Sequence, residues 1–149
     1  MANEKFWRCT NEAENHNGLQ YADGLIVDPL PWNPSGSCSP GGIYFADDAH
    51  ILEFLLSHSW VREVTIPPDA RVYAEDRKFK ADKVVLGPRV AIQDFLTQYI
   101  KDHHGIVGNV TVGVYGKFDA PALTTAGNVT VTVYGKFDAP NLKKVTNGK

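Results

Sequence analysis

GNVTVGVYGKFDAPAL at residues 108–123 is followed by GNVTVTVYGKFDAPNL at residues 127–142. The two segments begin 19 residues apart and are identical at 14 of 16 aligned positions. An internal repeat of this kind indicates that successive copies stack on one another. In each copy valines alternate with threonine or glycine, which predicts a strand with one apolar face. The repeat therefore decides the architecture of the last third of the chain.

Stacking the two copies would place aromatic residues on their counterparts, Tyr115 on Tyr134 and Phe118 on Phe137. Such aromatic pairs could offer a stacking surface for a sugar or a base, but packing within the repeats is the preferred interpretation. Two copies are fewer than the roughly three that repeat arrays usually need. We therefore expect the first copy to dock on the rest of the protein, at a helix over residues 89–102.

Composition limits the functions open to the chain. Its 149 residues suit about one domain, and a net charge of −2 without a basic stripe argues against sequence-specific nucleic-acid binding. No apolar run is long enough to span a membrane, and the start MANEKFWRCT lacks the hydrophobic region of a signal peptide. We therefore expect a cytoplasmic protein, with Cys9 and Cys38 as reduced thiols.

The residues before the repeat predict a mixed domain. Strands are expected at residues 5–10, 24–27, 42–46, 60–66, 70–73 and 83–86, and helices at 48–57 and 89–102. The expected fold is α+β, a small split antiparallel sheet with one buried and one bridging helix, capped by a two-coil β-solenoid. The expected domains are residues 1–104 and residues 105–149. The Pro- and Gly-rich loop at 28–42 would either rim a ligand site or only connect two strands.

Motifs for chemistry are few. Arg62 and Glu63 are adjacent in the strand WVREVTI, so one of them should point toward the core or a cleft. A carboxylate in a cleft is a candidate catalytic group, and surface charge is the alternative. The histidines have no metal-binding spacing, and neither a GxSxG motif nor a phosphate-binding loop is present. We therefore expect no metal site.

Two resemblances add to these patterns. Residues 108–142 resemble short β-solenoid repeats with DAP-x-L at the turn, which recur in bacterial and phage proteins. Residues 6–88 resemble an uncharacterised domain of phage, giant-virus and bacterial proteins, through FWRCT, GLQYADGLIVD, PGGIYFAD, WVREVTIPPDARVY and KADKVVLG. The order of these motifs is distantly similar to that of ADP-ribosyltransferases.

The transferase resemblance implies a site for NAD between the 28–45 segment and the WVREVTI strand. The residues that it implies for cofactor binding are Arg8, Thr10, Gly42 and Tyr44, with Tyr44 stacking on the nicotinamide. The late catalytic carboxylate would be Glu63 or Asp82. The chain lacks a (Q/E)xE motif, which departs from the family's pattern.

Three alternative functions, each from a different class, follow from these observations, and the first is the leading hypothesis. The first is a phage or mobile-element protein in the cytoplasm of a bacterial host, as the phage resemblance implies, with an ADP-ribosyltransferase-like domain that modifies a host macromolecule. The second is a non-enzymatic inhibitor or adaptor that binds a host defence complex, such as a CRISPR effector, by surface complementarity. The third is a self-associating structural module, with a homodimer formed through the edge of the repeats.

Overall fold

The computed structural model describes residues 5–16, 18–35, 40–54, 58–75, 77–112, 117–131 and 135–145. The chain divides into two compact units. The first unit comprises Met1–Asp48 and Trp60–Arg89, and the second comprises Ala49–Ser59 and Val90–Lys149. The expected division into domains at residues 1–104 and 105–149 stays a prediction.

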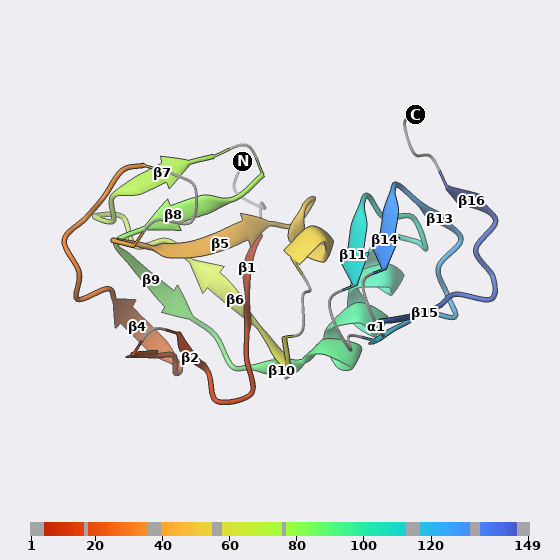
Figure 1. Cartoon of the computed structure of the whole chain (residues 1–149), viewed down its shortest axis with the longest axis horizontal. Helices are drawn as coiled ribbons and strands as arrows, with labels where there is room; N and C mark the ends of the chain where they lie inside the picture. Colours follow the sequence, from red (N-terminus) through yellow and green to blue (C-terminus); the bar gives the residue numbers. More distant parts are fainter. Residues whose placement is uncertain are drawn as a thin grey trace. The chain divides into compact units, whose positions relative to one another are not determined.

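Seven strands of the first unit form one sheet in which all neighbours are antiparallel (Figure 1). In spatial order they are β4 (Gly24–Val27), β9 (Lys83–Leu86), β6 (Trp60–Thr65), β1 (Phe6–Thr10), β5 (Ile43–Asp47), β8 (Phe79–Ala81) and β7 (Val72–Ala74). A separate hairpin joins β2 (Asn15–His16) to β3 (Leu19–Gln20).

The core of the first unit follows from the alternation of side chains along these strands. Its buried members are Tyr21, Ile26, Ile43, Phe45, Val64, Ala81, Val84 and Leu86. Two further phenylalanines pack against it: Phe6 meets both Phe45 and Phe79 edge to face, each with ring centroids 5.5 Å apart. This apolar cluster holds the sheet on which the polar site described below is built.

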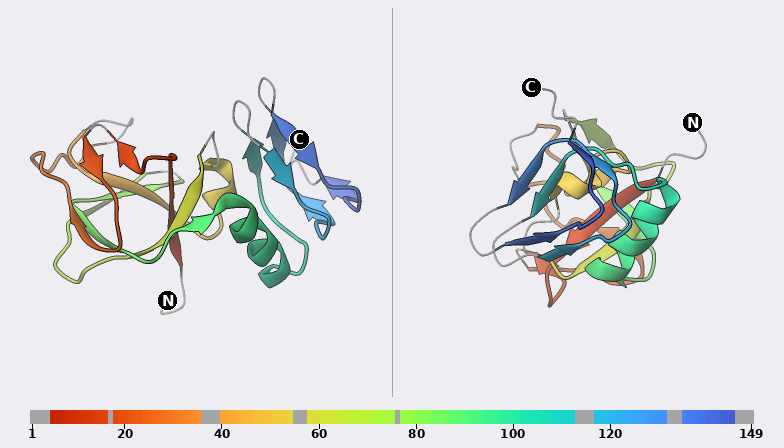
Figure 2. Two further views of the ribbon diagram at one scale, coloured as in Figure 1. Left: turned by 90° about the horizontal axis from the view of Figure 1, so that it is seen from below. Right: turned by 90° about the vertical axis from the view of Figure 1, so that its right-hand side faces the viewer.

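In the second unit the two repeat copies pair strand by strand (Figure 2). Three two-stranded parallel sheets result: β11 (Val110–Val112) with β14 (Val129–Val131), β12 (Lys117–Asp119) with β15 (Lys136–Asp138), and β13 (Thr125–Ala126) with β16 (Lys144–Val145). Every paired residue faces its own counterpart 19 positions along the chain. The predicted in-register stacking of Phe118 on Phe137 is confirmed, with ring centroids 5.0 Å apart. Tyr115 and Tyr134 lie outside the described residues.

Two helical elements of the same unit pack on the first copy. The short strand β10 (Val90–Ala91) leads into the helix α1 (Ile92–Asp102), whose buried side chains are Phe95, Leu96, Tyr99 and Ile100. The α1 helix contacts β12, and Gln93 Nε2 donates a hydrogen bond of 2.9 Å to the Asp119 carbonyl. A 3₁₀ helix, η1 (Ile51–Phe54), contacts β11. The first copy therefore docks on α1, because a repeat cannot bury its apolar face without a neighbour.

The expected fold class is wrong in three respects. The sheet of the first unit is not small and split, because seven strands follow one another in it. The buried helix expected at residues 48–57 is, in its described part, a single 3₁₀ turn. The described repeats form no solenoid, since two copies supply only two short strands to each sheet. No helix of the described residues is long and apolar enough to span a membrane.

Candidate functional site

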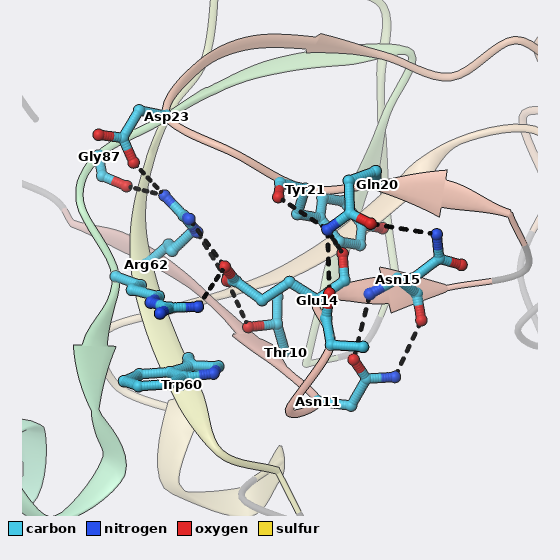
Figure 3. Close-up of polar contacts among 12 residues, drawn as sticks. Thr10, Asn11, Glu14, Asn15, Gln20, Tyr21, Asp23, Trp60, Arg62 and Gly87 are labelled. Atoms are coloured by element: carbon cyan, nitrogen blue, oxygen red, sulfur yellow. Dashed lines mark hydrogen bonds and ion pairs between the residues drawn. The ribbon is translucent and has the colours of Figure 1, made fainter.

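A buried ion pair lies at the centre of the polar residues of the first unit (Figure 3). Arg62 points inward from β6 and is 4% exposed, while Glu14 is 3% exposed. The pair is bidentate, because Nε and Nη2 of Arg62 donate to Oε2 and Oε1 of Glu14, both at 2.8 Å. Arg62 Nη1 also donates to Asp23 Oδ1 at 2.6 Å and to the Gly87 carbonyl at 2.7 Å. The guanidinium thus ties three segments of the chain together.

A turn brings Glu14 to this position. The Glu14 amide donates to the Asn11 carbonyl at 3.0 Å, and Glu14 itself has a left-handed backbone with φ 54°. Thr10 Oγ1, at the end of β1, donates to Glu14 Oε2 at 2.8 Å. Since a non-glycine residue rarely adopts positive φ, the contacts of the carboxylate must hold the turn in place.

Both members of the pair keep their charges. The hydrogen bonds from Arg62 hold the pKa of Glu14 below its usual value, although burial acts in the opposite direction. The hydrogen bonds to Glu14 raise the pKa of Arg62. A carboxylate that is saturated in this way has a structural role, because a catalytic acid or base needs a pKa close to the working pH.

Arg89 extends the cluster toward solvent. Its guanidinium carbon lies 4.0 Å from the centroid of the Trp60 ring, and its Nη1 is 3.5 Å from Glu14 Oε1. The Arg89 side chain is 49% exposed. Arg89 therefore covers the buried pair from outside, with a cation–π contact that fixes its position.

The structure does not bring the two predicted catalytic carboxylates together. Glu63 is exposed and points away from Arg62, its neighbour on β6. Asp82 lies between β8 and β9, where its two oxygens accept hydrogen bonds from the Arg71 amide at 2.8 Å and from Arg71 Nε at 2.9 Å. Burial raises the pKa of Asp82, but these contacts with Arg71 lower it further, so the net shift is downward.

The predicted cofactor-binding residues are likewise spread over two faces of the sheet. Trp7 faces Ala46 across β1 and β5, so the side chains of Arg8 and Tyr44 lie on opposite faces. Arg8 Nη1 donates to the Tyr44 carbonyl at 2.7 Å, and the Arg8 guanidinium lies over the Tyr21 ring, 4.6 Å from its centroid. Arg8 and Tyr44 are therefore joined through a backbone contact, with their side chains on opposite faces.

Gly42 has a different role from the one predicted. A Cβ at Gly42 would overlap the side chain of Lys80, which is fully buried beneath the 28–42 loop. Lys80 Nζ donates to the carbonyls of Asn33 at 2.9 Å, Ser35 at 3.0 Å and Pro40 at 3.3 Å. The glycine thus makes room for a lysine that fastens the loop to β8.

Replacing Gly42 by alanine should therefore destabilise the protein by roughly 1–3 kcal/mol, the range of an overpacked site. Part of this loss should disappear in a Lys80→Ala background, where the overlapping side chain is absent. A double-mutant cycle from urea unfolding would measure the coupling between the two positions. Strictly additive effects of the two substitutions would contradict this explanation of Gly42.

The described residues offer neither a reactive thiol nor a group of metal ligands. Burial raises the pKa of Cys9 to about 12, so this thiol stays protonated and unreactive at neutral pH. Cys38 lies outside the described residues. Within the ranges that the structure describes, no three His, Cys, Asp or Glu side chains are grouped as a metal site.

The edge of the second repeat copy exposes apolar side chains whose counterparts in the first copy are buried. Val112 of the first copy is 3% exposed, whereas its counterpart Val131 is 43% exposed. Ala126 is fully buried, whereas its counterpart Val145 is 50% exposed. The second copy thus repeats the apolar pattern of the first, but its valines are far less covered by the described residues. Exposed apolar side chains beside unpaired strand edges mark an interaction surface.

Sequence reasoning missed Glu14 and Lys80. Glu14 belongs to a polar segment whose sequence predicts only a turn, and its partner Arg62 is 48 residues away in the chain. The alternation of β6 did carry a signal, because it required either Arg62 or Glu63 to point inward. Nothing local to Lys80 distinguishes it from a surface lysine of a strand.

Comparison with known proteins shows that the chain is similar to proteins of a giant virus, Acanthamoeba polyphaga mimivirus. It is 34% identical over 101 residues to R868, described as an ankyrin repeat protein, covering 63% of this chain and 50% of R868. It is 33% identical over 97 residues to R229, also described as an ankyrin repeat protein, covering 59% of this chain and 32% of R229. It is 32% identical over 103 residues to the uncharacterized protein R869, covering 65% of this chain and 75% of R869.

The chain thus spans half or less of the two relatives described as ankyrin repeat proteins. An ankyrin repeat has two helices in about 33 residues, whereas the described part of this chain has a single α-helix. No family model and no solved structure matches the chain. The expected resemblances to ADP-ribosyltransferases and to bacterial and phage DAP-x-L repeats are wrong, because these relatives are giant-virus proteins of other descriptions.

Proposed function

Because the chain belongs to the family of the uncharacterized mimivirus protein R869, we propose its function from its own surface. It is a non-enzymatic protein-interaction module that binds a protein partner through the open edge of the second repeat copy. This edge comprises β14, β15 and β16.

The exposure of the second copy carries this proposal. Its sequence is that of a buried repeat, but Val131 and Val145 are about half exposed. Among the described residues, each of the three edge strands pairs with a single neighbour. An added strand from another protein would satisfy the free backbone groups and cover the valines together, as in β-augmentation.

Three carboxylates of the first unit support a binding role, because each of them is either exposed or held by an arginine. Glu63 is exposed on one side of β6, Asp82 is held by Arg71, and the Glu14 carboxylate is saturated by Arg62. No pair of these carboxylates is arranged for acid–base chemistry.

The relatives add independent support. R868 and R229 are described as ankyrin repeat proteins, and stacked repeats present extended surfaces to protein partners. A domain that accompanies such repeats fits a role in assembly better than a role in catalysis.

Site-specific photo-crosslinking tests the proposal. A benzoylphenylalanine at position 131 should give a covalent adduct with a protein, either a second copy in purified samples or another protein in Acanthamoeba extract. The same probe at position 98 is the control, because Gln98 is exposed on the α1 helix and does not lie on a strand edge. The adduct from position 131 should disappear when Val145→Lys places a charge in the same edge. Equal adducts from both positions, or none from position 131, would contradict the proposal.

A further inference from the structure

We propose that the partner at this edge is a second copy of the chain, paired antiparallel through β15 about a two-fold axis at Phe137. The inference rests on the proposed function, since it uses the same edge and names its occupant. Three observations on β15 and its surroundings carry it.

The first observation concerns the backbone of β15. The Ala120 amide donates to the Asp138 carbonyl at 2.8 Å, so the polar backbone groups of Asp138 face β12. These groups alternate between the two sides of a strand, and the N–H and C=O of Phe137 therefore face outward. Two Phe137 residues related by a two-fold axis can exchange both hydrogen bonds, as a hydrogen-bonded antiparallel pair does.

The second observation is the order of charges in β15. Antiparallel pairing centred on Phe137 places Lys136 opposite Asp138 of the second copy, and Asp138 opposite its Lys136. Pairing within the chain is parallel and instead sets Lys117 beside Lys136. No ion pair joins Lys136 or Asp138 to another described residue. Directly opposite charges stabilise a strand pair and like charges destabilise it, so the sequence Lys-Phe-Asp is complementary to itself only when antiparallel.

The third observation is the state of the first copy. Val110 is fully buried and Phe118 is 1% exposed, and the strands that contain them pack on η1 and α1 of the same unit. A second molecule therefore cannot continue the stack head to tail on that side. Edge-to-edge contact of identical surfaces closes after two copies, which gives a dimer and no filament.

A charge exchange tests the pairing by sedimentation equilibrium on the full chain. Wild type should sediment as a dimer of the 16.4 kDa chain. Lys136→Asp sets aspartates against each other and Asp138→Lys sets lysines against each other, so each should weaken the dimer roughly tenfold or more. The double variant Lys136→Asp/Asp138→Lys restores opposite charges and should restore the dimer. Lys101→Asp, an exposed substitution on α1 with the same charge change, should leave it intact.

The outcomes separate this inference from the proposed function. A double variant as monomeric as the single variants would overturn the antiparallel register. A wild-type chain that stays monomeric at every concentration, while position 131 crosslinks to a different protein, would overturn self-pairing but leave the proposed function standing. Circular dichroism of each variant shows whether a lost dimer reflects lost folding.

Discussion

Replacing Glu14 by alanine should lower the free energy of unfolding by about 3–5 kcal/mol, the usual loss when one partner of a buried ion pair is removed. Arg62 is 4% exposed and would keep its charge without the carboxylate that accepts two of its hydrogen bonds. Thr10 would lose its acceptor as well. Urea unfolding followed by tryptophan fluorescence measures the change.

Asp23→Ala is the matched control for this prediction. Asp23 also binds Arg62, at 2.6 Å, but its side chain is 72% exposed. Solvent replaces an exposed partner, so the control should lose less than about 1 kcal/mol. Equal losses for the two variants would show that burial of the Glu14 pair does not determine its contribution.

The same pair should make stability depend on pH in a defined direction. The pKa of Glu14 is lower in the folded protein than in the unfolded chain, so the unfolded chain takes up the proton first as pH falls. The contribution of Glu14 is therefore fully present above its unfolded pKa, roughly 4.3, and is lost as the pH falls through the folded pKa. Glu14→Ala should remove this part of the acid dependence.

The two repeat copies should respond very differently to the same substitution. Leu123 of the first copy is fully buried, whereas its counterpart Leu142 is partly exposed. Leu123→Ala leaves a cavity and should cost about 2–5 kcal/mol. Leu142→Ala should cost roughly 1 kcal/mol or less, because less apolar surface leaves contact with the protein.

This comparison is controlled by the chain itself, since both positions carry the same residue at the same place in the repeat. Thermal unfolding at low protein concentration keeps association from contributing to the result. Similar losses at the two leucines would mean that the second copy is as well covered as the first. That result would contradict the claim that the edge is an open binding surface.

The repeat was the part of the fold that the sequence predicted best. Because the two copies are nearly identical and 19 residues apart, in-register pairing of their strands sets each apolar residue beside its counterpart. Val110 meets Val129 and Phe118 meets Phe137. The stripe of α1 was equally readable, because Phe95 and Tyr99 recur at helical spacing. Both features depend on local periodicity.

The order of strands in the first unit could not be predicted in this way. It places β9 between β4 and β6, and β1 between β6 and β5, through pairings of residues far apart in the chain. The buried polar contacts are equally non-local, since Glu14 meets Arg62 and Lys80 meets the 28–42 loop. Motif order alone therefore suggested an NAD site whose proposed members, Arg8 and Tyr44, lie on opposite faces of the sheet.

Amide hydrogen exchange at Phe137 tests the central claim most directly, because this N–H faces the open edge. If the edge binds a second copy, exchange at Phe137 is slow in concentrated protein and becomes fast on dilution. The Ala120 amide, bonded to Asp138 within the chain, serves as the reference and should stay protected throughout. Fast exchange at Phe137 at every concentration, with Ala120 still protected, would contradict the account.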